Sequence, residues 1–454
     1  MVQGFRPALA AAALLLAGAA EASVPPDTAA RLGTSLTPLG GERAGNAAGT
    51  IPAWEGAPAP PPGWQPGNRY ADPYPDETPL LAIDQANAAG YAAHLSPGQQ
   101  ALLRRYAGSY RLTVYPGHRN YAAPDAYYAG TLRNASRAFL EKPGLPPSQA
   151  VAGIPFPFPG SGAEVAWNER LRWRGPGREG TYVQASVSED GIASQVRLAE
   201  RARFDAIDAA PYRKYGQVLA CSAVAVFEPA KLAGAIRLVY DTLKPPPTAW
   251  QRSPGQRFIS SSGSAGGDTP VLAANGLLDE DQVEGFSGAP DRYDWTLDGK
   301  RELYVPYNAY RAHDAGFSYA ALLGPHHLNP DAARYELHRV WVLQGRCRPE
   351  QSCQWPRRTL YLDEDSWQVL LAELYDRDDR LAVLQEMHWL MAYDQPAPLP
   401  VLQVVYDLVN GRYLATGMNN QAPETRFIRP ELDSLAPDEM GGWAHRIGAV
   451  PPRD

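Results

Sequence analysis

Two groups of side chains in this sequence have the composition of a chemical site, and the first is a pair of histidines. His326 and His327 lie together in a turn-rich stretch, residues 324–330. A metal site needs imidazole nitrogens that converge on one point, whereas adjacent histidines point in different directions. The eight histidines include no H-E-x-x-H motif and no other pair four residues apart. We therefore predict that the protein has no metal site.

The second group is a run of three carboxylates, Asp363, Glu364 and Asp365, between two apolar segments. Paired carboxylates can divide the roles of general acid and general base. A solvated turn between two strands accounts for the same run without any chemistry, and we favour that interpretation. The sequence also lacks a G-x-x-x-x-G-K-[ST] phosphate loop, a strand–helix G-x-G-x-x-G and a G-x-S-x-G nucleophile elbow. We predict a protein that is not an enzyme, has no catalytic residues and needs no cofactor.

One charged residue stands in an apolar strand pattern. Arg339 lies within residues 335–343, on the same face of the predicted strand as Trp341. A buried charge needs a partner, which here is either a structural carboxylate or the head group of an amphipathic ligand. We favour the structural carboxylate. Arg339 and Trp341, together with Tyr304 and Tyr307, are the candidate ligand-binding residues.

The cysteines indicate an oxidising compartment. Cys347 and Cys353 lie six residues apart in a polar, turn-like segment, where two neighbours close a small disulfide loop after export. The alternative is half of a metal site, but no cysteine or histidine pair lies nearby to complete four ligands. Cys221 lies in the apolar run 218–227, and we expect it to be a buried free thiol.

The N-terminus has the layout of a secretory signal. Arg6 precedes an apolar run, residues 8–20, that ends in the small-x-small pattern Ala20-Glu21-Ala22. We predict a signal peptide over residues 1–22, cleavage between Ala22 and Ser23, and a periplasmic protein. No later apolar run is long enough to cross a bilayer, so we expect no transmembrane segment in the mature chain. The net charge of −7 argues against a nucleic-acid partner.

The first part of the mature chain is poor in strand signals. Residues 23–75 are rich in Pro and Gly and predict an extended arm that either wraps a core or stays mobile. Residues 76–180 form a helical and connector region. One helix should begin at Ser96, because a serine N-cap, a proline at the first helical position and Gln99 follow in order. A second helix is expected over residues 124–140.

Residues 181–425 predict an antiparallel sheet of short strands with short connections, followed by a C-terminal tail, residues 426–454. The serine- and glycine-rich run 260–268 predicts a mobile loop. Three dipeptides between apolar or β-branched runs suit tight hairpin turns, because Gly, Asn and Asp tolerate a positive φ. They are Asp190-Gly191, Asp298-Gly299 and Asn410-Gly411.

Six stretches of the chain resemble the bacterial domain-of-unknown-function 1329 family. They are LGTSLTPLGGERAGNAAGTIPAW (32–54), GIPFP (153–157), GAPDRYDW (288–295), YVPYNAY (304–310), HLNPDAARYELHRVWV (327–342) and LYLDEDSW (360–367). Members of this family resemble the periplasmic lipoprotein-localisation factors, the LolA/LolB-like superfamily. The resemblance implies a mainly β fold, in which a large curved antiparallel sheet forms an incomplete barrel and helices pack on or cap its concave face. It brings no catalytic or binding residues with it.

Three functions fit these observations. The first is a carrier for a hydrophobic or lipid-like molecule in outer-membrane or envelope transport, with outer-membrane or exporter proteins as partners. Exposing an acyl chain to water costs about 0.8 kcal/mol of free energy per methylene. Burial of the chain against an apolar concave sheet would recover that free energy. The alternatives are a non-enzymatic envelope scaffold and an unrecognised hydrolase or polar-ligand binder. A large apolar cavity favours the carrier, a filled core with an exposed apolar patch favours the scaffold, and a polar cleft favours the third.

Overall fold

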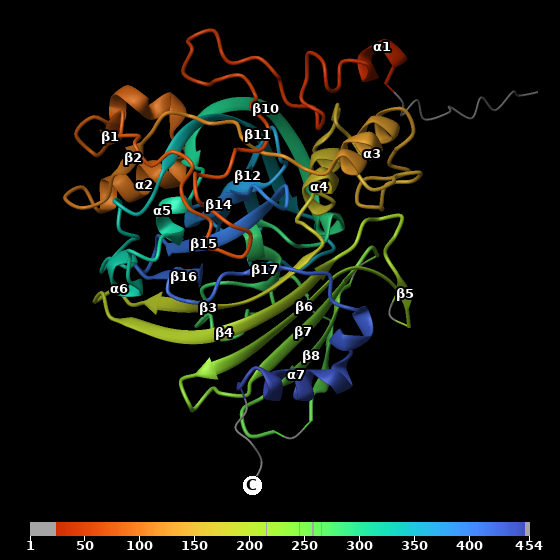
Figure 1. The fold of residues 1–454 in the computed structure, drawn as a ribbon, viewed down its shortest axis with the longest axis vertical. Coiled ribbons are helices and arrows are strands. Elements are labelled where there is room, and N and C mark those ends of the chain that lie inside the picture. The colour runs from red at the N-terminus through yellow and green to blue at the C-terminus, as the bar shows by residue number, and fades with distance from the viewer. Residues whose placement is uncertain (1–23, 215, 245, 257, 265, 450–454) are drawn as a thin grey trace, which may run out of the picture.

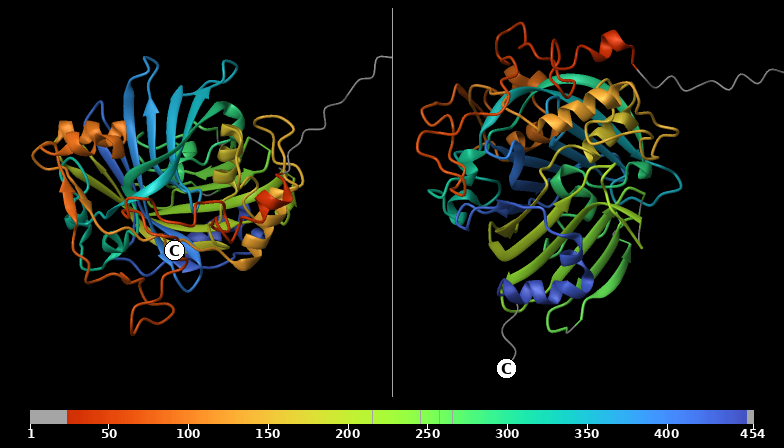
Figure 2. Two further views of the ribbon diagram at one scale, coloured as in Figure 1. Left: turned by 90° about the horizontal axis from the view of Figure 1, so that it is seen from above. Right: turned by 45° about the vertical axis from the view of Figure 1, so that its right-hand side comes forward.

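The computed structural model describes residues 24–214, 216–244, 246–256, 258–264 and 266–449 (Figure 1). The predicted signal peptide and its cleavage site lie outside these residues. The described part of the chain forms one 17-stranded sheet with few helices. Figure 2 shows that the strands curve around the segments inside them. This arrangement confirms the predicted mainly β fold with an incomplete barrel.

The strand bounds are β1 Leu81–Ile83, β2 Leu112–Val114, β3 Gly177–Val187, β4 Ala193–Phe204, β5 Tyr212–Arg213, β6 Gly216–Glu228, β7 Ile236–Thr242, β8 Thr248–Arg252, β9 Ser260–Ser264, β10 Tyr293–Pro306, β11 Tyr335–Cys347, β12 Arg357–Asp363, β13 Val369–Tyr375, β14 Leu381–Ala392, β15 Ala397–Asp407, β16 Tyr413–Met418 and β17 Arg426–Phe427. The α-helices are α1 Pro26–Ala29, α2 Pro97–Arg105, α3 Asp125–Ala135, α4 Gly162–Arg170, α5 Tyr310–His313, α6 Tyr319–Leu322 and α7 Met440–Arg446. The 3₁₀ helices are η1 Ala88–His94, η2 Glu280–Gly285, η3 Pro290–Arg292, η4 Leu432–Leu435 and η5 Pro437–Glu439.

Two antiparallel series of strands make the sheet. One runs from β10 through β16 in chain order, and the other runs β3, β4, β6, β7, β8 and β9. The series join where β16 pairs with β3, with Tyr413 opposite Val187. A parallel pairing, Tyr335 with Val114, links β11 to β2. No pairing joins β9 to β10 within the described ranges, so the sheet stays open.

Local sequence signals account for several element boundaries. Helix α2 begins at Ser96 as predicted: the Ser96 hydroxyl accepts a bond from the Gln99 N–H, and the Gln99 side chain accepts one from the Ser96 N–H. The second predicted helix is present as α3 and ends at Ala135, five residues before the predicted end. Turns at Asp190-Gly191 and Asn410-Gly411 join β3 to β4 and β15 to β16, as expected.

Two local predictions are wrong. Asp298-Gly299 lies inside β10, where the register with β11 shifts between Leu297 and Gly299. Gly299 uses its positive φ of 92° for this bulge and not for a hairpin turn. The predicted loop at 260–268 contains β9, which pairs with β8. Hydrogen bonds of the backbone to β8 hold this serine-rich segment extended despite its composition.

The core lies on both faces of the sheet. Strand β13 is buried at all of its residues, which means that neither of its faces reaches solvent. Helix α4 packs against β10 and β11, and α2 packs against β14. Figure 1 places α7 beside β7 and β8, at the opposite end of the molecule from α2, α3 and α4, and α7 contacts β7.

The carboxylates of the 363–365 turn are buried, so the prediction of a solvated turn is wrong. Asp363, Glu364 and Asp365 are each no more than 1% exposed. The turn does connect β12 to β13, but the N-terminal arm and Arg119 cover it. Sequence neighbours could not indicate this, because the covering residues lie more than 200 positions away.

Three cations bind two of the three carboxylates of this turn. Arg119 binds both oxygens of Asp365, at 2.7 and 2.8 Å. Arg339 and Lys300 bind the two oxygens of Glu364, at 2.6 and 2.7 Å. Arg119 and Arg339 also donate to backbone carbonyl oxygens of the arm, including those of Glu42 and Ala44. The ion pairs therefore fasten the arm to the sheet.

The Arg119→Ala substitution tests this attachment. It leaves the Asp365 carboxylate buried without its partner, so we expect the free energy of unfolding to fall by about 3–5 kcal/mol. Urea unfolding measures the change. Arg111→Ala is the matched control, because Arg111 pairs with Asp331 at an exposed site and should lose at most about 1 kcal/mol. Equal losses in the two variants would contradict the assignment.

Candidate functional site

Strands β6 and β7 have a packed cluster on one face and a cavity on the other, because their side chains alternate between the two faces. On β6, Cys221, Ala223 and Ala225 belong to a buried cluster with the C-terminal segment. Ser222 and Val224 face the other way and line a cavity. Because successive strand residues point to opposite faces, one strand both packs against α7 and forms a cavity wall.

Strand β7 repeats the pattern. Ile236, Leu238 and Tyr240 join the cluster that contains Met440 and Trp443 of α7. The intervening residues Arg237, Val239 and Asp241 line the cavity. The sequence does contain a signal for this wall, although it was not among the predicted sites. Arg237 and Asp241 are two charged residues, four positions apart, on one face of an otherwise apolar strand.

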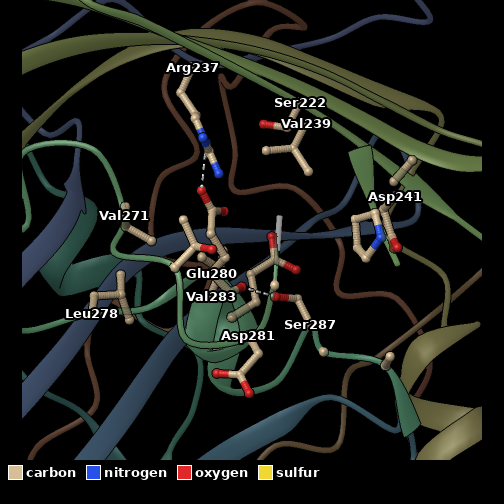
Figure 3. Close-up of a pocket in the computed structure, with 18 of the residues that line it drawn as sticks. Ser222, Arg237, Val239, Asp241, Val271, Leu278, Glu280, Asp281, Val283 and Ser287 are labelled. Carbon is tan, nitrogen blue, oxygen red and sulfur yellow. Dashed lines mark hydrogen bonds and ion pairs between the residues drawn. The ribbon is translucent and has the colours of Figure 1, made fainter. Parts of the chain in front are cut away.

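The cavity has a volume of about 800 Å³ and lies between β3, β4, β6 and β7 and the segment 266–292. Figure 3 shows Arg237, Val239 and Ser222 on one side and Val271, Leu278, Glu280, Val283 and Ser287 across from them. Its apolar lining comes from both walls. These residues are Tyr182, Phe204, Ala220, Val224, Val239, Pro246, Pro247, Val271, Leu272, Leu278, Val283 and Ala289.

The segment 266–292 forms the inner wall, and its position depends on a sharp bend. Within η2 the backbone turns at Val283, and Glu284 has a φ of 54°. Gly285 follows with a φ of 86°, and a Cβ on it would lie 2.6 Å from Val369 Cγ1. A glycine is required there by both conformation and space. A smaller pocket of about 110 Å³ shares Val283 and Glu284 with the large cavity.

Glu284 is held at this bend by arginines. Its two carboxylate oxygens lie 2.7 Å from Arg172 and 2.9 Å from Arg178. Burial disfavours the ionised carboxylate, but Arg178, Arg172 and Arg174 outweigh that penalty and hold the pKa of Glu284 at about 2. Burial raises the pKa of Glu169 to about 7, against the opposing effect of Arg172 and Arg174.

Arg237 offers the cavity a free donor. Its Nε donates to Glu280 at 3.0 Å and its Nη1 to Ser262 at 2.9 Å. The remaining nitrogen, Nη2, is buried and has no hydrogen-bond partner in the described residues. An acceptor oxygen of a bound molecule would satisfy it.

Carboxylates, arginines, amides and hydroxyls make up the polar lining of the cavity. Among the described residues that line the cavity, none is a histidine or a cysteine. The lining serines, such as Ser222 and Ser287, therefore have no imidazole beside them to act as a general base. Within the same described residues, no three His, Cys, Asp or Glu side chains come together as a metal site.

The four candidate residues from the sequence lie elsewhere in the core. Arg339 pairs with Glu364, which is the structural alternative we favoured. Trp341 stacks on Trp367 with ring centroids 5.7 Å apart, and Lys300 lies over its ring at 4.7 Å. These residues do not line the large cavity.

The two candidate tyrosines are also set in packed surroundings. Tyr304 makes edge contacts with Tyr91 and His94. Tyr307 stacks on His338 with centroids 3.8 Å apart and donates to Asp363 at 3.3 Å. A direct ligand contact by any of the four candidates stays a prediction.

The cysteine predictions are confirmed. Cys347 and Cys353 form a disulfide with a Cα–Cα distance of 6.2 Å, and Cys221 is a buried free thiol. The histidine pair has aromatic neighbours: His326 stacks on Tyr106, and His327 makes an edge contact with Tyr110. Burial lowers the pKa of His327.

One buried carboxyl group has hydrogen-bond donors but no cation beside it. Glu386 on β14 is fully buried and accepts hydrogen bonds from the hydroxyls of Tyr335, at 3.0 Å, and Tyr110, at 3.3 Å. Burial raises its pKa to about 7, although both hydrogen bonds favour the carboxylate. Nearby His388 is also buried, which lowers its pKa to about 3.

Comparisons with known proteins identify the family of this chain. The model of the protein family of unknown function DUF1329 matches residues 82–440. The chain belongs to the DUF1329 family. A family relative, an uncharacterised protein of Pseudomonas aeruginosa, is 39% identical over 428 residues, which cover 92% of this chain and 94% of the relative.

Solved structures similar to this DUF1329 protein include another member of the family. A DUF1329 family protein from Desulfovibrio piger has a TM-score of 0.40 and 13% identity, covering 57% of this chain and 89% of that one. A LolA superfamily protein from Nitrosomonas europaea has a TM-score of 0.37 and 10% identity, covering 59% of this chain and 93% of that one. In the described ranges, no helix has both the length and the apolar character needed to span a membrane.

Because of Glu386, the stability of the folded protein should fall as the pH rises. Its pKa rises from an ordinary value of 4.5 to about 7 on folding, so the folded protein binds this proton more tightly. The resulting stabilisation is complete below pH 4.5 and is lost as the pH rises through 7.

In the wild type, the titration of Glu386 should lower the free energy of unfolding by about 3 kcal/mol between pH 5 and pH 8. We expect this part of the decrease to be absent in Glu386→Gln, because glutamine stays neutral. Urea unfolding at both pH values measures it. Parallel pH profiles for the variant and the wild type would refute the assignment to Glu386.

Proposed function

We propose that this protein binds and carries a hydrophobic or lipid-like molecule in the cavity between β3, β4, β6 and β7 and the segment 266–292. The observation that supports the proposal is the cavity itself. Its volume of about 800 Å³ falls within the range of roughly 300–1,000 Å³ typical of small-molecule sites. Apolar residues from both walls would cover an acyl chain, and each buried methylene contributes about 0.8 kcal/mol.

We further propose that binding takes place in the periplasm and that the molecule is moved between envelope proteins. The N-terminal signal pattern and the disulfide support an exported protein, because disulfides persist in oxidising compartments. The carrier role agrees with the lipoprotein-localisation proteins that the family resembles. Outer-membrane or exporter proteins are the partners that such a route requires.

The alternatives have less support. A scaffold would use a contiguous exposed apolar patch, whereas the feature that the structure provides is a cavity with an apolar lining. The large exposed apolar side chains lie in separate segments of the sequence. They are Leu80, Leu132, Leu145, Ile192, Phe258 and Val409. A serine hydrolase would need an activated nucleophile, and the described lining residues place no histidine beside a serine.

Native mass spectrometry, combined with lipid extraction, tests the proposal on protein purified from a bacterial periplasm. We expect a co-purifying lipid-like molecule at close to one per chain. A clean apo mass, together with no uptake of fluorescent fatty acids or phospholipids, would overturn the carrier role.

A cavity-filling variant assigns the binding to this cavity. Val239 lines it from β7, so Val239→Trp should lower the affinity for a fluorescent fatty acid at least about tenfold, since overpacking costs roughly 1–3 kcal/mol. The measurement is a fluorescence titration. Val409→Trp makes the same change at a position 62% exposed and outside the cavity lining, and it should bind like the wild type. Unchanged binding by Val239→Trp would place the ligand elsewhere.

A further inference from the structure

Arg174 stands apart from the other arginines that line the cavity. Its Nη1 lies 3.9 Å from Glu284 Oε2, and Arg172 already binds that same oxygen at 2.7 Å. The other oxygen of Glu284 is bound by Arg178 at 2.9 Å. Both carboxylate oxygens therefore have a nearer cation than Arg174.

The surroundings of Arg174 give it little else to bind. Its guanidinium lies over the ring of Phe204, 4.2 Å from the centroid, and its side chain is 16% exposed. An aromatic face attracts a cation but supplies no acceptor oxygen. No hydrogen bond joins the guanidinium to another residue in the described part of the chain. Arg174 is also one of the residues that line the cavity.

The charges around Arg174 leave a positive surplus. The cluster contains Arg172, Arg174 and Arg178 against Glu169, Glu200 and Glu284. With a pKa of about 7, the Glu169 carboxyl is partly protonated near neutral pH. Burial and then Arg172 lower the pKa of Arg174 to about 10, which leaves it charged at neutral pH. The protein thus buries a cation that its own carboxylates only partly compensate.

Four further carboxylates that line the cavity pair with different arginines. Asp241 pairs with Arg170, Glu280 with Arg237, Asp268 with Arg292, and Asp281 with Arg292 and Arg358. These contacts engage the four carboxylates elsewhere. Asp291 also lines the cavity, but no hydrogen bond or ion pair joins it to Arg174 in the described residues, so Arg174 is free to bind an anionic group of a bound molecule. Apolar side chains line the same cavity and would hold a hydrocarbon chain.

We propose that Arg174 is the head-group subsite of the cavity, where it binds the carboxylate or phosphate of an acyl-chain amphipath. The inference rests on the proposed lipid-like ligand and adds the charge of its head group. The guanidinium donates two parallel hydrogen bonds to the anion, because its planar fork matches carboxylate and phosphate oxygens. The hydrocarbon chain lies along the apolar walls.

Three probes of equal chain length test the subsite: dodecanoate, dodecyl phosphate and dodecanol. Calorimetric titration, below the critical micelle concentrations of the two anions and the solubility limit of dodecanol, gives the affinities of the three probes for the full-length mature protein. We expect the wild type to bind at least one anion about tenfold or more tightly than the alcohol, as hydrogen bonds to charged groups imply. The ratio between the two anions distinguishes a carboxylate from a phosphate head group.

Arg174→Gln should abolish the preference for the anion and leave dodecanol binding unchanged, whereas Arg174→Lys should keep part of the preference. The control Arg111→Gln removes an exposed arginine and should match the wild type. Thermal unfolding separates a binding role from a structural one. We expect Arg174→Gln to be at least as stable as the wild type, because it removes a poorly compensated buried cation.

The outcomes separate the two proposals. Equal binding of all three probes, unchanged in Arg174→Gln, would overturn the subsite and leave the carrier role standing. Binding of none of the probes would overturn both. Loss of dodecanol binding together with a lower melting temperature in Arg174→Gln would assign Arg174 a structural role and overturn the subsite.

Discussion

An open, curved antiparallel sheet has an inner face that other parts of the chain must fill, and this constraint governs the rest of the molecule. Along the first series of strands, α4 and the N-terminal segments pack against the sheet. Along β3, β4, β6 and β7 the filling segment 266–292 stays at a distance, and the cavity is the space between them. The outer face of β6 and β7 is covered by α7, so these strands are supported without a packed interior.

The cavity combines apolar walls with a chain of ion pairs. Glu284 lies where that chain meets the bend of η2, and its arginine partners come from β3 and from the segment after α4. Ion pairs with hydrogen bonds require a specific geometry, whereas apolar contacts tolerate different arrangements of the side chains. The ion pairs therefore fix the position of the bend, and the apolar residues line the cavity.

Local signals made much of the fold predictable. The capping residues at Ser96, the turn at Asn410-Gly411 and the spacing of Cys347 and Cys353 each act within a few residues, and each gave the correct local structure. The burial of the 363–365 turn was not predictable, because its cover comes from a distant arm. Gly299 shows a second limit, since a positive φ serves a bulge as well as a turn.

The residues that line the cavity were not predicted from the sequence, because hydrophobic periodicity does not distinguish a packed face from one that lines a cavity. On β6 both faces carry small or apolar side chains, so periodicity does not reveal which face lines a cavity. On β7 the charges of Arg237 and Asp241 did mark the inner face. Arg174 follows α4 in an irregular segment, where no periodic pattern applies and only the arrangement of Glu284 and its arginines distinguishes it.

The attachment of the N-terminal arm bears on how this protein can evolve. Arg119 and Arg339 bind the arm through the carbonyl oxygens of Glu42 and Ala44, and every amino acid has such an oxygen. The exposed positions of the arm can therefore drift in sequence, whereas Leu39 and Ile51 are buried in the core and other positions leave no room for a side chain. A Cβ on Gly41 would lie 2.6 Å from Asp365 Oδ1, and one on Gly45 would lie 2.4 Å from the Ile51 carbonyl oxygen. Selection should thus be strict at these glycines and at the arginines, and relaxed at the exposed side chains between them.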